Sequence, residues 1–130
     1  MKEFDEPTRK RIWDATTIAP AGYENTLLRK DRYGAWVQYD KYKDDDSEFR
    51  WHIDHICPRA ILEKKGISEE KINADINLQV MHYRNNESKN DDYPTFHIKV
   101  TSRGIFNIEV EEMRTIDLVK QEELKRFYNL

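Results

Sequence analysis

The sequence predicts a single domain of the α+β class, and three observations favour it. The chain has 130 residues, a length at which one compact core forms and roughly two thirds of the unfolded surface is buried. Helical patterns occupy both ends, and short apolar runs typical of strands lie between them. We expect a core motif over residues 49–92, an N-terminal extension over 1–48, and a C-terminal hairpin and helix over 93–130.

The N-terminal extension is expected to hold a helix and a strand. The helix has Pro7 in its first turn and ends near Pro20, where the sequence APAG turns the chain. Side chains that alternate over residues 35–40 predict the strand. The polar, mainly acidic run KDDDSE over residues 43–48 indicates a solvated loop. A dedicated metal site is less favoured there, because adjacent carboxylates in a flexible loop repel one another.

The core motif is expected to contain two strands and a helix. The first strand covers residues 49–56 and ends near Pro58, which has no backbone N–H to donate. Two short helices over 59–75 connect it to a second strand over 76–81. That strand passes directly into a helix over 82–90.

The C-terminal part is expected to form a hairpin and a helix. Two strand-like runs, residues 96–100 and 105–110, flank the sequence TSRG, with Gly104 in the turn. Apolar side chains at near-helical spacing over residues 115–128 predict a helix that packs on the rest of the domain.

Composition limits the classes of partner and the compartment. The net charge of −3 argues against a uniformly basic nucleic-acid-binding protein, because lysine and arginine supply the affinity for phosphate. Any contact with DNA must therefore be local or assisted by a metal ion. Cys57 is the only cysteine, which excludes an intrachain disulfide framework and a four-cysteine zinc site. No apolar run approaches the roughly 20 residues of a membrane span, so we expect a cytoplasmic protein without a membrane partner.

Several polar side chains capable of chemistry lie in the core motif. Asp54 and His55 are near the end of the first strand, where alternation sends them to opposite faces unless the strand distorts or ends. On the following helix His82, Asn86 and Lys89 share one face, because they are spaced i, i+4 and i+7.

This set matches the needs of phosphodiester hydrolysis. Asp54 offers a hard oxygen ligand suited to Mg²⁺ or Mn²⁺, and Asn86 offers a neutral carbonyl oxygen. His55 can be the general base, because histidine is the side chain most often used for that role near neutral pH. Lys89 and Arg84 could hold phosphate oxygens.

The runs IDHICP, NLQVM and NNESK resemble those of the HNH endonucleases, whose domain is a ββα-metal or His-Me finger. The spacing agrees, with 22 residues from His55 to Asn77, nine more to Asn86 and three more to Lys89. The likeness is greatest to small stand-alone phage and bacterial members and covers about residues 12–96.

The resemblance implies a metal-dependent endonuclease that hydrolyses DNA. It makes His55 the general base, Asn77 the brace of the loop that holds this base, and Asp54 and Asn86 the ligands of one divalent ion. Mg²⁺ is the first choice, with Mn²⁺, Ni²⁺ and Zn²⁺ as alternatives, and no organic cofactor is implied. The helix would lie against the DNA backbone. The residues expected near phosphate or DNA are His82, Arg84, Asn85 and Lys89.

The sequence differs from the family pattern at two places, and two alternative functions remain. His52 stands where many close relatives carry an acidic residue, and the longer run RAILEKKGISEEK replaces a glycine pair in the linking loop. The first alternative is a non-catalytic nucleic-acid-binding module of the same shape. The second is a toxin-type effector controlled by a protein partner, which would dock on the terminal helix, residues 115–130.

Overall fold

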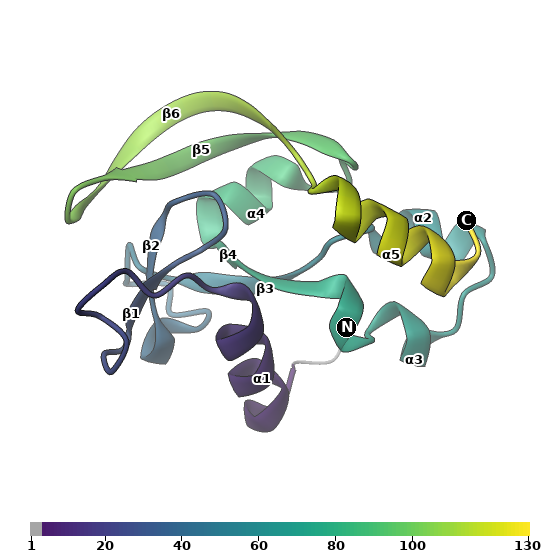
Figure 1. Cartoon of the computed structure of the whole chain (residues 1–130), viewed down its shortest axis with the longest axis horizontal. Helices are drawn as coiled ribbons and strands as arrows, with labels where there is room; N and C mark the ends of the chain where they lie inside the picture. The colour runs from purple at the N-terminus through teal and green to yellow at the C-terminus, as the bar shows by residue number, and fades with distance from the viewer. Residues whose placement is uncertain (1–3) are drawn as a thin grey trace.

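The computed structural model describes residues 4–130 and shows a mixed α and β fold with small antiparallel sheets, which confirms the α+β class (Figure 1). The helices are α1 (Glu6–Thr16), α2 (Arg59–Lys64), α3 (Glu69–Ile72), α4 (Tyr83–Lys89) and α5 (Leu118–Tyr128). The strands are β1 (Leu28–Lys30), β2 (Trp36–Gln38), β3 (Trp51–His55), β4 (Leu78–His82), β5 (Thr95–Arg103) and β6 (Phe106–Thr115). Within residues 4–130, no helix combines the length and the apolar character needed to cross a membrane.

The strands pair in the order of the chain, β1 with β2, β3 with β4 and β5 with β6. In the central pair, Asp54 of β3 lies opposite Gln79 of β4. On its other edge β3 has an isolated bridge between Tyr42 and Trp51. Beyond Trp51, that edge has no strand partner in the described part of the chain, and it remains open to other contacts.

The β3–β4 pair lies between two layers. Helix α1 covers one face, where Ile12 and Trp13 pack in one cluster with Val80. Toward the other face lie α4 and the β5–β6 hairpin, which arches over α4 in Figure 1. Met81 and Phe96 belong to the buried cluster on this side. The strands therefore have apolar neighbours on both faces, and polar groups there must be paired.

Helix α1 is fixed by hydrogen bonds at both ends. The Asp5 carboxylate accepts from the backbone N–H of Thr8 over 2.9 Å, as expected of an N-cap. The helix ends at Thr16, earlier than the predicted end near Pro20. There the Thr16 hydroxyl accepts from the backbone N–H of Val80 over 2.9 Å, which ties the end of α1 to β4.

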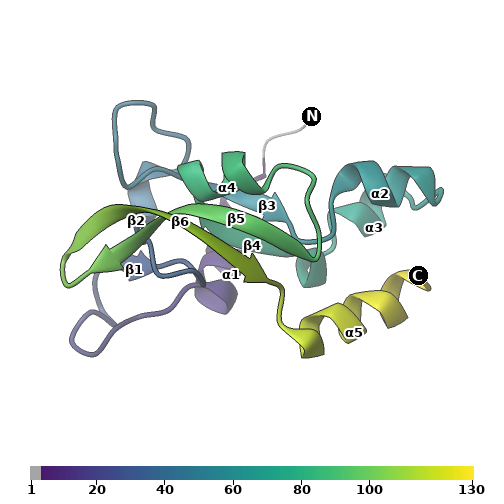
Figure 2. The same ribbon diagram turned by 90° about the horizontal axis from the view of Figure 1, so that it is seen from above.

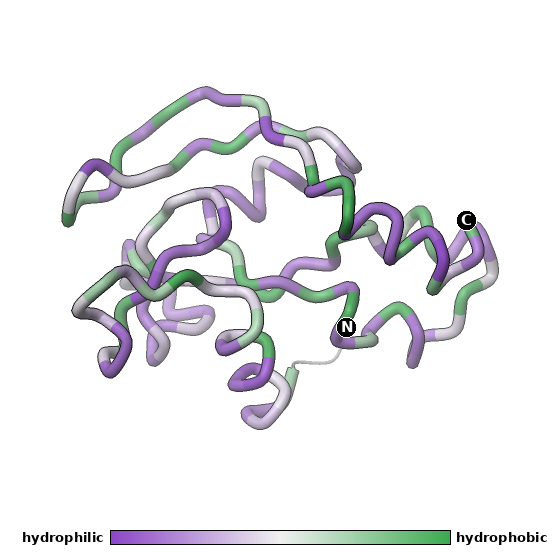
Figure 3. Tube along the Cα trace, viewed as in Figure 1, coloured by the Kyte–Doolittle hydropathy of each residue, from purple (hydrophilic) through white to green (hydrophobic). Residues whose placement is uncertain are grey.

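The C-terminal hairpin lies where it was predicted but is longer. The prediction gave residues 96–100 and 105–110, whereas β5 and β6 together extend from Thr95 to Thr115. Gly104 occupies the turn with φ of 59°, a conformation that favours glycine. Figure 3 shows hydrophilic and hydrophobic residues alternating along the hairpin. The mostly exposed β6 carries so many charged residues that its apolar pattern alone did not indicate its full length.

The three remaining helices pack together at one end of the molecule (Figure 2). Leu62 of α2, Ile72 of α3 and Leu124 of α5 belong to one buried cluster. The hydroxyl of Tyr128 donates to the backbone oxygen of Lys71 over 2.6 Å. Helix α5 thus holds α3 in place, and the residue that follows α3, Asn73, contacts His55.

Candidate functional site

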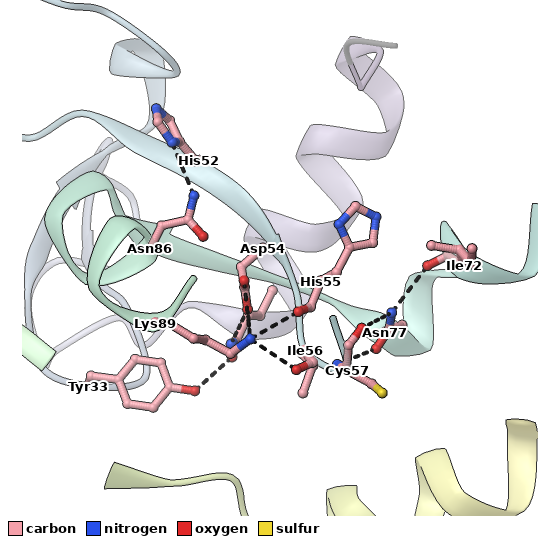
Figure 4. A network of polar contacts seen from close by, with 11 residues as sticks. Tyr33, His52, Asp54, His55, Ile56, Cys57, Ile72, Asn77, Asn86 and Lys89 are labelled. Atoms are coloured by element: carbon pink, nitrogen blue, oxygen red, sulfur yellow. Dashed lines mark hydrogen bonds and ion pairs between the residues drawn. The ribbon is translucent and has the colours of Figure 1, made fainter. Parts of the chain in front are cut away.

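A pocket of about 350 Å³ lies along the open edge of β3. Asp54 and His55 from β3 and Asn86 from α4 all line it, so three of the predicted site residues border one space. The other lining residues are Ile53, Pro58, Arg59, Glu87, Asn90 and Asp91. Figure 4 shows the polar network around this pocket.

Asp54 is only 6% exposed and is held by donors from neighbouring elements. Gln79 Nε2 donates to Asp54 Oδ2 over 2.9 Å, and the hydroxyl of Tyr33 donates to Gln79 Oε1 over 3.0 Å. Burial raises the pKa of the Asp54 carboxyl, and the nearby Lys89 ammonium opposes this by lowering it. A carboxylate offers about four lone-pair positions, so Asp54 retains capacity for a further ligand.

Lys89 is wholly buried beneath β5. Its ammonium lies 3.3 Å from Asp54 Oδ2 and donates to the backbone oxygens of His55 and Ile56 over 3.1 and 3.0 Å. These three acceptors match the three N–H donors of an ammonium group. The placement is at odds with the expected contact between Lys89 and phosphate, because no part of this side chain reaches the surface. Lys89 instead joins the end of α4 to the end of β3.

His55 points away from Asp54, as strand alternation predicted (Figure 4). Its Nε2 lies 2.7 Å from Asn73 Oδ1, and its ring centroid lies 6.0 Å from that of Phe4. His55 and Asp54 still border the same pocket, because the pocket follows the edge of β3 and not one of its faces.

Asn77 connects the segment after His55 to the start of β4. Its Oδ1 accepts from the backbone N–H of Cys57 over 2.8 Å. Its Nδ2 donates to the backbone oxygens of Cys57 and Ile72 over 3.1 and 3.2 Å. The side chain is fully buried, and every contact is to backbone. Asn77 therefore has the contacts that the expected bracing role requires.

Asn86 presents its carbonyl oxygen to the pocket. Its Nδ2 lies 3.2 Å from His52 Nδ1, and since an amide nitrogen only donates, the ring nitrogen accepts. Burial lowers the pKa of His52, which favours the neutral ring that this contact needs. Among residues 4–130, no donor reaches Asn86 Oδ1, and Figure 4 shows this oxygen on the side of Asp54. His52, whose role the sequence left open, therefore orients Asn86.

His82 is held by backbone on both ring nitrogens. Its Nδ1 accepts from the N–H of Arg84 over 3.2 Å, which caps α4. Its Nε2 lies 2.7 Å from the backbone oxygen of Glu48, an acceptor, so Nε2 carries the proton. Burial lowers the pKa of His82 to about 4. The buried ring is a structural connection, at odds with the expected contact to DNA.

Of the two neighbouring residues Asn85 and Arg84, one is buried and the other is partly exposed. Asn85 is fully buried, and its Oδ1 accepts from the backbone N–H groups of Lys99 and Val100 over 2.9 Å, so it fastens α4 to β5. This placement is also at odds with an expected contact to DNA. Arg84 remains partly exposed, 3.2 Å from a carboxylate oxygen of Glu109. Of the four residues expected near phosphate, only Arg84 reaches the surface.

The low pKa of His82 predicts a loss of stability in acid. Between about pH 6.5 and pH 4 the unfolded chain binds a proton at this position and the folded chain does not, so stability falls as the pH falls. Urea unfolding at a series of pH values should show the parent losing about 2–3 kcal/mol more than His82→Asn between pH 7.5 and pH 4. Asparagine keeps an oxygen to cap α4. Equal pH dependence in the two proteins would contradict the assignment.

Three residues near the site were not predicted. Gln79 and Tyr33 support Asp54, and Asn73 contacts His55. The alignment of Gln79 with Asp54 depends on the register of β3 and β4. Asn73 follows α3, in a segment that the sequence marked only as a connection. For Gln79 and Asn73 the one available signal was an amide side chain within the core motif, and Tyr33 gave no such signal.

The charge of the pocket favours a cation. Asp54, Glu87 and Asp91 line it, and the one basic lining residue, Arg59, is ion-paired with Glu69. Among residues 4–130, no group of three His, Cys, Asp or Glu side chains gathers as a metal site. Of the lining groups, the Asp54 carboxylate and the Asn86 carbonyl oxygen are the two donors that the resemblance implies. Two hard oxygens suit an ion such as Mg²⁺, which keeps several of its waters.

The pocket therefore unites an imidazole, two hard oxygen donors and a negative potential. Such a set can bind a divalent cation and take a proton from water beside it. Comparison of the chain with protein-family models, with curated proteins and with solved structures finds no match.

Proposed function

We propose that the chain is a metal-dependent endonuclease that hydrolyses phosphodiester bonds in DNA, on a ββα-metal core of the HNH type. The observation that carries the proposal is the pocket shared by Asp54, His55 and Asn86. Strands β3 and β4 are antiparallel and α4 follows directly, which is the element order that the resemblance implies. Asn77 makes the backbone contacts that brace the end of β3.

In this mechanism each side chain has one task. His55 takes a proton from the attacking water. Asp54 and Asn86 would hold a divalent cation, which when bound stabilises the negative charge that develops on the phosphate and on the departing oxygen. Asn77 keeps the backbone after His55 in place. Gln79 fixes the orientation of the Asp54 carboxylate by donating to its Oδ2.

A bound cation would also reduce the repulsion between the pocket and DNA phosphate. A DNA phosphate approaching this pocket meets the carboxylates of Glu87 and Asp91 as well as that of Asp54. A divalent cation at the pocket would offset the charges of Glu87 and Asp91 and so remove this repulsion. The charge of Asp54 is already offset by Lys89.

Supercoiled plasmid incubated with Mg²⁺ or Mn²⁺ tests the proposal. We expect nicking that a chelator prevents. Asp54→Asn leaves Lys89 without its counter-charge, so circular dichroism must first show that the variant is folded. In the folded variant nicking should be abolished, and Mn²⁺ affinity measured by calorimetry should fall about tenfold or more. Asp46→Asn, in an exposed loop, is the matched control. DNA binding without cleavage would instead favour the non-catalytic module, and absence of both Mn²⁺ binding and cleavage would refute the nuclease.

A further inference from the structure

Among the residues that the structure describes, the His55 ring makes its hydrogen bond with a side chain of the core motif that was not among the predicted site residues. His55 Nε2 lies 2.7 Å from the Oδ1 of Asn73, 18 positions further along the chain. The distance alone does not say which atom donates, because either ring nitrogen can carry the proton and an amide can be turned over.

Two charged neighbours fix the orientation of the Asn73 amide. Asn73 Nδ2 lies 3.2 Å from Glu69 Oε1, and since an ionised carboxylate only accepts, the atom facing it must be the amide nitrogen. Arg59 Nη2 lies 3.4 Å from Asn73 Oδ1, and since a guanidinium only donates, the atom facing it must be the oxygen. Both neighbours point to the same orientation.

The two neighbours also bind each other. Arg59 and Glu69 form a two-pronged ion pair, in which Arg59 Nη2 lies 2.9 Å from Glu69 Oε1 and Nη1 lies 2.5 Å from Oε2. Ser68 caps α3, and the side chain of Asn77 donates to the backbone oxygen of Ile72, next to Asn73. Asn77 also binds the backbone of Cys57, two residues after His55. It therefore links the segment that follows His55 to the segment that precedes Asn73.

We propose that Asn73 is a positioning residue that fixes the tautomer and the orientation of His55. The Asn73 oxygen accepts, so His55 Nε2 carries the proton and Nδ1 keeps the lone pair. In the proposed reaction, on which this inference rests, Nδ1 is then the atom that takes the proton from water. Asn73 acts only through His55 and does not touch the substrate.

The ring nitrogens can be read directly by long-range ¹H–¹⁵N NMR at about pH 8.5, two units above the ordinary pKa of histidine. We expect His55 to show a proton on Nε2 that exchanges slowly with water, and Nδ1 to be unprotonated. His55→Gln assigns the signals. His82 is an internal control, because backbone groups fix its proton on Nε2 and no Asn73 variant touches it.

Two variants of similar size complete the test. Asn73→Leu removes the acceptor and should let the Nε2 proton exchange freely, with kcat for nicking lowered about tenfold or more and KM for DNA little changed. Asn73→Asp keeps an acceptor and should retain the slow Nε2 proton. A proton on Nδ1 in a parent protein that cuts DNA overturns the inference and leaves the nuclease proposal standing. The expected tautomer in a protein that binds no Mn²⁺ and cuts no DNA overturns the nuclease proposal instead.

Discussion

Replacing His55 by alanine is expected to slow the nicking of plasmid DNA by about 10²- to 10⁴-fold, or roughly 3–5 kcal/mol in the activation free energy. The variant loses the one imidazole that borders the pocket, which in the proposed mechanism takes the proton from water. Mn²⁺ affinity should stay within about twofold of the parent, because the proposed metal ligands are Asp54 and Asn86. Single-turnover nicking and calorimetry measure the two effects separately.

The control for this prediction is His97→Ala. His97 is exposed on β5 and does not line the pocket, so its loss should leave the nicking rate unchanged. A rate for His55→Ala equal to that of the parent would remove His55 from the mechanism. A rate that falls together with Mn²⁺ affinity would mean that His55 supports the metal and is not the base.

The helices and the central strands could be predicted from the sequence because their signals are local. Asp5 and Ser68 are caps whose hydrogen bonds lie within one helical turn. The strand β1 was missed, since three residues contain no periodicity and this segment becomes a strand only by pairing with β2. The predicted strand over residues 35–40 shortened to β2 because the chain turns into a 3₁₀ helix at Tyr39.

The candidate site also contains residues that could be predicted from the sequence and contacts that could not. Spacing along the chain was enough to single out Asp54, His55 and Asn86, which the fold brings to one pocket. Helical spacing also placed Lys89 on the face of Asn86, but spacing does not reveal which neighbour covers that face. The hairpin β5–β6 covers part of α4, so Lys89 is buried and forms an internal ion pair with Asp54. Contacts between distant segments, such as His55 with Asn73, depend on tertiary packing that no local pattern encodes.

Lys89→Met is expected to have the largest effect on stability, a loss of about 3–5 kcal/mol in the free energy of unfolding. The variant leaves the buried Asp54 carboxylate without its counter-charge and two backbone oxygens without a donor. Asp54 can reduce the cost by binding a proton, since burial already raises its pKa. Because the pKa of Asp54 is higher in the folded variant than in the unfolded chain, protonation at low pH stabilises the folded state. The loss of unfolding free energy relative to the parent should therefore be smaller at pH 5 than at pH 8. Urea unfolding at both pH values measures it.

A double-mutant cycle separates the ion pair from the rest of the Lys89 contacts. Asp54→Leu combined with Lys89→Met removes both charges, and it should recover about 2 kcal/mol of the single-variant loss because no unpaired charge remains buried. The matched control is Lys99→Met, which makes the same substitution in the exposed pair with Glu111 and should cost at most about 1 kcal/mol. If Lys89→Met costs no more than Lys99→Met, Lys89 is not committed to Asp54. Its ammonium would then be free to meet a phosphate, as the sequence first suggested.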